Sequence, residues 1–79
     1  MQVLKFGGSS LANASAISQV MKIIRIASAR DKTIVVASAL SGVTDTLIRA
    51  GIMAGSGDTG YTTLIDDLQA RHITVINEL

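Results

Sequence analysis

A lysine, two glycines and two hydroxyl residues stand together at the end of the first apolar run, as Lys5-Phe6-Gly7-Gly8-Ser9-Ser10. The run over residues 3–6 predicts a strand, and the glycines predict a turn toward a helix. Glycine lets backbone N–H groups come close to a ligand. A helix that starts after such a turn offers unpaired N–H groups and its positive dipole end to an anion. With the charge of Lys5, the segment predicts a phosphate site; an ordinary turn beside a surface lysine is the alternative.

Small and hydroxyl residues also follow the second predicted strand, over residues 38–45 (Ser-Ala-Leu-Ser-Gly-Val-Thr-Asp). The carboxyl ends of parallel strands meet at one edge of a sheet, where α/β proteins bind ligands. Because neighbouring strands lie about 4.8 Å apart, Ser38 and Thr44 are expected near Lys5 and the glycine turn. The alternative is structural: Ser41 or Thr44 caps the next helix, and the Ser38 hydroxyl bonds to backbone.

Other motifs in the sequence give weaker evidence of function. A G-x-G-x-x-G pattern at Gly55, Gly57 and Gly60 follows a predicted helix rather than a strand, so it is interpreted as a linker and not as a dinucleotide site. His72, the single histidine, lies on a predicted apolar helix stripe and is interpreted as a packed structural residue. No cluster of His, Cys, Asp or Glu has the spacing of metal ligands, so no protein metal site is predicted.

The elements that must position these residues alternate in type. Strands are predicted over residues 2–6 and 33–37, the second as a β-branched run buried on both faces. A helix capped by Asn13 lies between them, and a second helix is predicted over 44–54. Residues 55–60 form a flexible linker to a last helix. The predicted inward positions are Ile17, Val20, Met21, Ile24 and Ala27, then Leu47, Ile48, Ala50 and Ala54, then Leu64, Ile65, Leu68, His72, Val75, Ile76 and Leu79.

This order, strand–helix–strand–helix–helix, predicts an α/β fold with a parallel sheet and a right-handed crossover. Two parallel strands cannot form a stable sheet alone. Of the 79 residues 48% are apolar, yet only two are aromatic. Residues 1–79 are therefore expected to be a fragment of a larger α/β domain, with surface intended for burial.

Composition narrows the function classes. The net charge is +1 with no basic run, so nothing indicates binding to nucleic acid or to a charged membrane surface. No apolar stretch approaches the about 20 residues of a membrane-spanning helix, and the N-terminus is not typical of a signal peptide. Without cysteines there is no disulfide framework. A cytoplasmic location is the expectation.

The two motifs together resemble a known family. Residues 5–10, Ser38-Ala39 and Val43-Thr44-Asp45 are similar to the opening of aspartate kinases, in the amino acid kinase superfamily. Arg71-His72 and Val75-Ile76 resemble the segment that follows there. The resemblance covers all 79 residues but implies only the N-terminal part of a three-layer catalytic domain. Ser9 stands where threonine is commoner, which keeps the hydroxyl.

The resemblance implies transfer of a phosphoryl group from ATP to the β-carboxylate of L-aspartate, the first step toward the aspartate-family amino acids. It implies that Lys5 is catalytic, that Ser38 and Thr44 contact aspartate, and that Mg²⁺ accompanies the phosphates without a protein ligand in this chain. The implied nucleotide-binding residues are Lys5, Phe6, Gly7, Gly8 and Ser9.

Two other interpretations stay open. Other amino acid or carbamate kinases of the superfamily share a lysine and a glycine pair, although residues 38–45 favour aspartate kinase. The isolated chain could instead be a non-catalytic structural fragment. The implied partners are ATP, L-aspartate and the remainder of the catalytic domain, and a homo-oligomer is expected for the complete enzyme.

Overall fold

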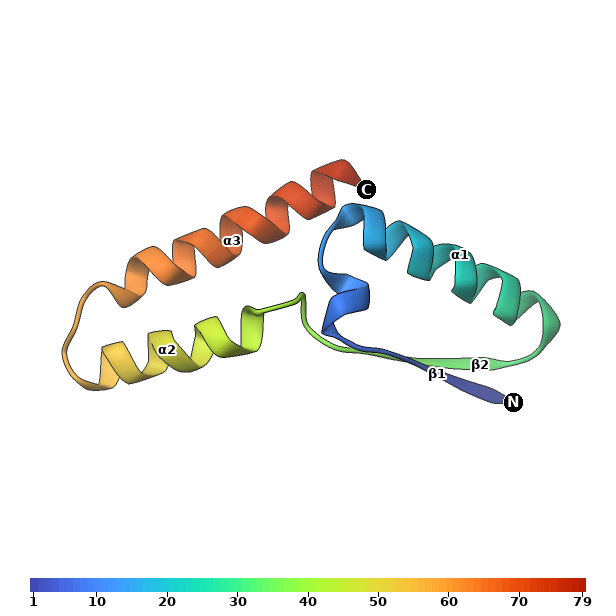
Figure 1. Ribbon diagram of the computed structural model, residues 1–79, viewed down its shortest axis with the longest axis horizontal. Helices are drawn as coiled ribbons and strands as arrows, with labels where there is room; N and C mark the ends of the chain where they lie inside the picture. The colour runs from blue at the N-terminus through green and yellow to red at the C-terminus, as the bar shows by residue number, and fades with distance from the viewer. The chain divides into compact units, whose positions relative to one another are not determined.

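Two strands and a helix between them form the first part of the chain, and two helices form the second. The computed structural model describes residues 1–79 as two units, Met1–Ser41 and Gly42–Leu79. The elements are labelled in Figure 1. The first unit holds β1 (Gln2–Phe6), the 3₁₀ helix η1 (Gly8–Leu11), α1 (Ala14–Arg30) and β2 (Thr33–Ala37); the second holds α2 (Val43–Gly55) and α3 (Tyr61–Glu78).

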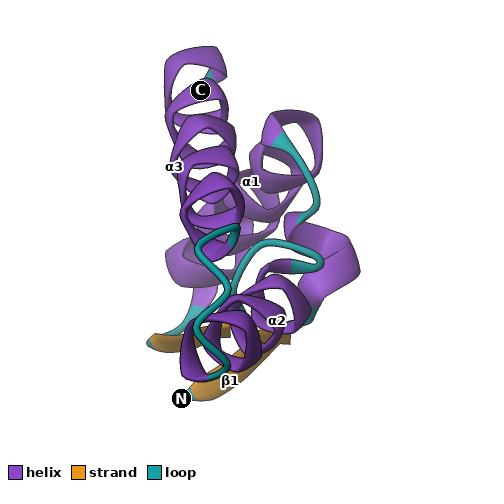
Figure 2. Ribbon diagram, turned by 90° about the vertical axis from the view of Figure 1, so that its left-hand side faces the viewer, coloured by secondary structure: helices purple, strands orange, loops and turns teal.

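β1 and β2 pair in parallel, as the sequence predicted. Gln2 is opposite Thr33 at the first position of the register, and Phe6 is opposite Ala37 at the last. Figure 2 shows the strands as one layer, and α1, which connects them, covers one face of it. The α/β fold class and the strand–helix–strand order are confirmed.

Local sequence signals fix the ends of α1. The Asn13 side chain accepts a hydrogen bond from the Ala16 N–H at 2.9 Å, the N-cap that its residue type predicts. The helix continues through Arg30, and Asp31 ends it. Val20 of α1 is buried, as predicted. Met21 is 47% exposed, so the prediction that Met21 points inward is wrong.

The first unit is tied together at the amino ends of its strands. The Gln2 side-chain amide donates to the Ala27 carbonyl at 3.0 Å and to the Thr33 hydroxyl at 3.1 Å. The Met1 ammonium pairs with the Asp31 carboxylate at 2.8 Å. These bonds link the end of α1 to both strands at the end opposite the glycine turn.

The prediction that the second strand is buried on both faces is wrong for this chain. Ile34, Val35 and Val36 are 48%, 40% and 48% exposed. Ile34 pairs with Val3 on the sheet face that α1 does not cover. The β-branched run specified a strand, but no element of the first unit covers its open face.

α2 and α3 form an antiparallel helical hairpin (Figure 1). Its most deeply buried residues are Val43 and Ala50 on α2 and Val75 on α3. On α2 the seam runs at three- and four-residue spacing through half-buried Thr46 and Met53. Of the predicted inward positions on α2, only Ala50 is correct, because Leu47, Ile48 and Ala54 are exposed.

The long apolar stripe predicted for the last helix divides into two faces. Leu64 and Leu68 are half-buried and lie at seam spacing with Val75. The remaining predicted positions (Ile65, His72, Ile76 and Leu79) are exposed. His72 is therefore not packed; its Nδ1 atom donates to the Leu68 carbonyl oxygen at 2.7 Å. No helix of the structure combines the length and apolar character that crossing a membrane requires.

Hydrogen bonds define the connection that was predicted to be flexible. The Asp58 side chain accepts from the Gly60 N–H at 2.8 Å, and the Asp58 N–H donates to the Met53 carbonyl at 2.9 Å. Gly57 has a φ of 82°, which favours glycine. This turn follows α2 rather than a strand, so the interpretation of its three glycines as a connection is confirmed.

Substitution of two glycines of the hairpin by alanine is expected to have opposite effects on the stability of α2. Gly42, the N-cap of α2, has a φ of 81°, where a side chain is strained. We expect Gly42→Ala to destabilise α2 by about 1–2 kcal/mol, so that its amides exchange hydrogen roughly 5–30 times faster. Gly51 lies inside α2 with open space around it, so Gly51→Ala is expected to slow exchange about two- to fivefold. Equal effects of the two substitutions would contradict the left-handed conformation of Gly42.

Candidate functional site

The glycine turn and the start of the second loop meet at the carboxyl edge of the sheet. The Ser38 N–H donates to the Phe6 carbonyl at 3.1 Å, which continues the strand pairing by one residue. A Cβ atom built on Gly8 would lie 3.7 Å from the Ser38 Oγ atom and 3.7 Å from the Ser41 Cα atom. The parallel register therefore brings Gly8, Ser38 and Ser41 together, as the strand–helix–strand order predicted for the first two.

Neither glycine of the turn is required by backbone conformation. Gly7 has a φ of −81°, and Gly8 is not among the residues with positive φ. A Cβ atom on Gly7 would meet no atom within 4 Å, and one on Gly8 would make only ordinary contacts. Packing within the chain thus does not demand glycine at either position, and the turn leaves open space beside its backbone.

A short 3₁₀ helix that the sequence did not predict lies between the glycine turn and the helix capped by Asn13. The first helical element is the four-residue η1, and its Ser10 N–H donates to the Gly7 carbonyl at 3.1 Å. α1 begins only at Ala14, where the Asn13 side chain already serves one of its free N–H groups. The N-terminus of the long helix is therefore not the element that the glycine turn presents.

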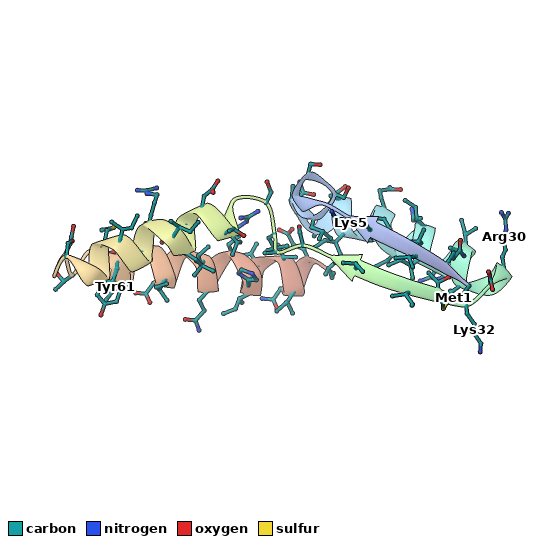
Figure 3. The ribbon with its side chains drawn as sticks, turned by 90° about the horizontal axis from the view of Figure 1, so that it is seen from below. Met1, Lys5, Arg30, Lys32 and Tyr61 are labelled. Carbon is teal, nitrogen blue, oxygen red and sulfur yellow. The ribbon has the colours of Figure 1, made fainter.

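The Lys5 side chain is exposed on β1 and makes no ion pair or hydrogen bond within the chain. Along β1 half-buried and exposed residues alternate, so Lys5 shares with Val3 the face that α1 leaves open. Its register partner on β2 is Val36, two residues before Ser38. Figure 3 shows Lys5 well away from Met1, Arg30 and Lys32, which gather at the amino end of the strands. Lys5 is thus a lone cation on the carboxyl half of the sheet.

The hydroxyl groups of the second loop have separate roles. The Ser38 hydroxyl donates to the Ala39 carbonyl at 2.7 Å, which is the structural alternative that the sequence allowed for it. The capping alternative is wrong, because the N-cap of α2 is Gly42, which has no side chain to accept a capping hydrogen bond. Thr44 is exposed in the first turn of α2, and its hydroxyl makes no hydrogen bond. Since Thr44 belongs to the second unit, its expected proximity to Lys5 stays a prediction.

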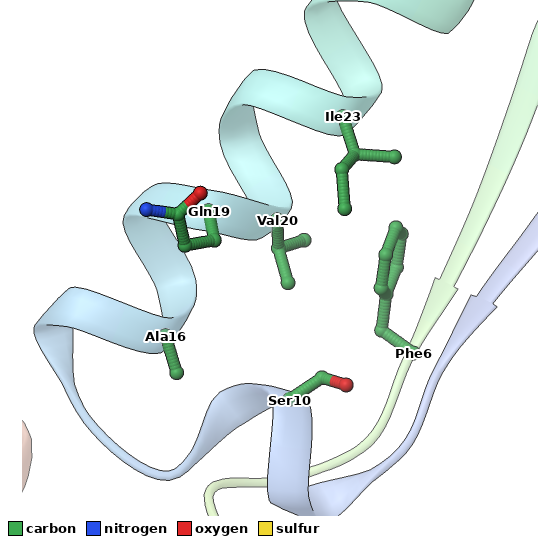
Figure 4. Close-up of a pocket in the computed structure, with 6 residues that line it drawn as sticks. All are labelled: Phe6, Ser10, Ala16, Gln19, Val20 and Ile23. Atoms are coloured by element: carbon green, nitrogen blue, oxygen red, sulfur yellow. The ribbon is translucent and has the colours of Figure 1, made fainter.

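Sequence reasoning considered Ser41 only as a helix cap and missed its position beside Gly8. The signal was present, because Ser41 belongs to the same hydroxyl-rich loop as Ser38. Phe6 has its backbone at the site edge, while its ring points toward Val20 and Ile23 of α1 (Figure 4). Phe6 therefore contributes its carbonyl to the edge and anchors the end of β1 through its side chain.

No group of three or more His, Cys, Asp or Glu side chains lies close enough together to hold a metal ion. His72 is tied to the backbone of its own helix and has no catalytic neighbour among the site residues. The chemistry available at the edge is thus one exposed cation, the hydroxyl-bearing residues of the two loops and an open stretch of backbone at the glycine turn.

Comparison with known proteins identifies the family of this chain. No curated protein and no solved structure gives a significant match to the chain. The sequence does match the amino acid kinase family over residues 1–78, which includes the glycine turn, the second loop and both helices of the hairpin. A match of this extent indicates phosphoryl transfer of the amino acid or carbamate kinase type, with ATP as the expected donor. The chain belongs to the amino acid kinase family.

Proposed function

We propose that this chain is the N-terminal part of an aspartate kinase catalytic domain. The complete enzyme would transfer the γ-phosphoryl group of ATP to the β-carboxylate of L-aspartate. The observation that carries the proposal is the meeting of Gly8 with Ser38 at the carboxyl edge, 3.7 Å from Cβ position to Oγ atom. At this edge the glycine turn and the loop after β2, which both resemble loops of aspartate kinases, lie next to each other.

Lys5 is proposed as the catalytic residue. Phosphoryl transfer depends mainly on positioning and on electrostatic stabilisation of the charge that develops on the transferred group. The Lys5 ammonium is free of internal partners, so it is available to an anionic ligand. It would stabilise the negative charge on the transferred phosphoryl group and the bridging oxygen.

The backbone of the turn fits phosphate oxygens. The first N–H groups of a short helix have no carbonyl partner within it, and those of Gly7, Gly8 and Ser9 would donate to the nucleotide. A group placed beside Gly7 would meet no side chain of this chain. Phe6 belongs to the same segment and would hold it in place through its packing on α1.

The residues present do not fit a protein-held magnesium ion, because the structure contains no cluster of acidic ligands. Mg²⁺ would reach the site bound to the nucleotide phosphates rather than to side chains of this chain. Its chemistry when bound would be to neutralise phosphate charge.

Ser38 and Thr44 are proposed to contact aspartate. Ser38 lies beside the glycine turn, and Thr44 presents an unbonded hydroxyl on the first turn of α2. A hydroxyl can accept from the substrate ammonium or donate to a substrate carboxylate. In this role the pair would distinguish aspartate from smaller or longer carboxylate substrates.

The second candidate is another amino acid or carbamate kinase of the same family, which shares the lysine and glycine pair. A substrate panel separates the two. The complete enzyme would be given ATP with aspartate, glutamate, N-acetylglutamate or carbamate, and acyl phosphate would be trapped with hydroxylamine. Aspartate hydroxamate as the main product supports the proposal. A clear preference for any other substrate would identify the enzyme as another kinase of the family rather than an aspartate kinase.

The chain of 79 residues is expected to lack kinase activity by itself and to self-associate. Its sheet has two free edges and one uncovered face, which favour contacts between copies. Sedimentation velocity and a coupled ADP-release assay would check this. A monodisperse monomer that unfolds cooperatively, or measurable ATP turnover, would contradict the proposal that the remainder of a catalytic domain completes the fold.

A further inference from the structure

The Ser38 hydroxyl group can accept a hydrogen bond from a ligand but has no hydrogen left to donate. A serine hydroxyl carries one donor and two acceptor lone pairs. The Ser38 O–H donates to the Ala39 carbonyl oxygen at 2.7 Å, and a carbonyl oxygen cannot donate in return. Ser38 is exposed, so its Oγ atom remains accessible to a ligand. A ligand that meets this oxygen must therefore bring a hydrogen-bond donor.

Gly8 borders the same oxygen atom. A Cβ atom on Gly8 would lie 3.7 Å from the Ser38 Oγ atom, so the side chain that glycine lacks would stand beside this hydroxyl. Gly8 does not have a positive φ, and an added Cβ would make only ordinary contacts. Since neither conformation nor packing requires glycine here, the open space beside the Ser38 oxygen is available to a ligand group.

The neighbouring glycine of the turn borders a different space. A Cβ atom on Gly7 would meet no atom within 4 Å, the Ser38 Oγ atom included. A methyl group on Gly8 would therefore crowd the Ser38 oxygen, whereas a methyl group on Gly7 would not. The two adjacent glycines can be distinguished by experiment for this reason.

We propose that Ser38 and Gly8 together bind the α-ammonium group of the phosphoryl acceptor. The Ser38 oxygen accepts a hydrogen bond from the ammonium, and Gly8 leaves room for it. This inference rests on the proposed transfer to the carboxylate of an amino acid, and it assigns Ser38 to the amino end of that substrate. The acceptor is then an amino acid with a free α-ammonium group.

A carboxylate would bind this pair poorly. An ionised carboxylate only accepts hydrogen bonds, so it would place its oxygen against the lone pairs of Ser38. Thr44 differs from Ser38, because its hydroxyl makes no hydrogen bond within the chain and can still donate to a carboxylate. The two hydroxyl residues proposed to contact the substrate thus recognise different groups of it.

Comparison of aspartate with succinate tests the proposal. Succinate has both carboxylates of aspartate and lacks the ammonium group. KM for aspartate and the competitive inhibition constant of succinate would be measured for the complete enzyme and its variants, and the melting temperature would check folding. If the substrate panel selects glutamate, glutamate and glutarate replace aspartate and succinate.

We expect Ser38→Ala to raise KM for aspartate about 10- to 100-fold, the effect of losing a hydrogen bond to a charged group. The inhibition constant of succinate should change less than about twofold, because succinate has no ammonium to donate to Ser38. Ser38→Thr keeps the hydroxyl group and should hold KM for aspartate within about threefold of the parent value.

Gly8→Ala provides a second test that leaves Ser38 in place. An ammonium nitrogen about 2.9 Å from the Ser38 oxygen on the Gly8 side would overlap with the new methyl group. Gly8→Ala should therefore raise KM for aspartate at least about tenfold and change the inhibition constant of succinate less than about threefold. Gly7→Ala is the matched control, and it should leave the ratio of the two constants unchanged.

Equal changes for aspartate and succinate in Ser38→Ala would make Ser38 a structural or carboxylate-binding residue and overturn the proposal. An unchanged KM for aspartate in Ser38→Ala, or equal shifts of the ratio in Gly8→Ala and Gly7→Ala, would also overturn it. A preference for glutamate with the same contrast against glutarate would overturn the aspartate assignment and support this proposal. A preference for an acceptor without a free ammonium group, such as carbamate, would overturn both.

Discussion

Lys5→Ala is expected to lower kcat of the complete enzyme by 10²–10³ and to change KM for aspartate little. The substitution removes a charge that would act mainly as the phosphoryl group transfers. Loss of one such interaction in a site sheltered from water costs about 3–4 kcal/mol of transition-state stabilisation. Lys5 has no internal partner, so its removal should not unpair any other charge of the chain. Steady-state ADP release at saturating ATP and aspartate measures the effect.

Lys32→Ala is the matched control for this experiment. Lys32 is also exposed, but it precedes β2 and lies at the opposite end of the strands. It should leave kcat within about twofold, since surface substitutions away from a site change little. Lys5→Arg separates charge from shape, because it keeps the charge on a differently shaped group. If Lys5→Ala kept near-normal kcat, Lys5 would not be the catalytic residue.

The second large effect is expected in substrate binding rather than in turnover. Thr44→Val should raise KM for aspartate about 5–30-fold, since a hydroxyl contact is worth about 1–2 kcal/mol and valine keeps the branched shape. The Thr44 hydroxyl makes no hydrogen bond within the chain, so its loss should not destabilise α2. KM for ATP should stay unchanged, which separates the substrate site from the nucleotide site.

Thr46→Val provides the comparison on the same helix. The Thr46 hydroxyl donates to the Gly42 carbonyl at 3.1 Å, a bond internal to the first turn of α2. Its removal should lower the stability of α2 slightly and leave KM for aspartate within about twofold. An unchanged KM in Thr44→Val, or equal increases in both variants, would remove Thr44 from the substrate site.

The sequence by itself determined the two strands, the three α-helices and their order. The β-branched run of β2 and the asparagine before α1 are local signals, and the structure has a strand and an N-cap at those positions. The glycine turn and the hydroxyl loop were each recognisable from residue type alone. Their meeting at one edge followed from the parallel arrangement, because strand direction decides which loops share an edge.

Helix faces were predicted less well, and the reason is physical. Periodicity shows which residues are apolar, but the neighbouring element decides which of two apolar stripes it contacts. On α3 the stripe through Leu64 and Val75 packs against α2, while Ile65 and Ile76 remain exposed.

Backbone geometry around the glycines was also decided by the tertiary structure. The glycine pair Gly7-Gly8 permits positive φ, yet positive φ occurs at Gly42 and Gly57 instead. Glycine residues show where the backbone can adopt positive φ, but the path of the folded chain decides which of them adopt it. The sequence thus determined which residues can do chemistry and which elements carry them. Only the packed structure decided that Ser41 also lies beside Gly8, because that contact depends on the path of the loop after β2.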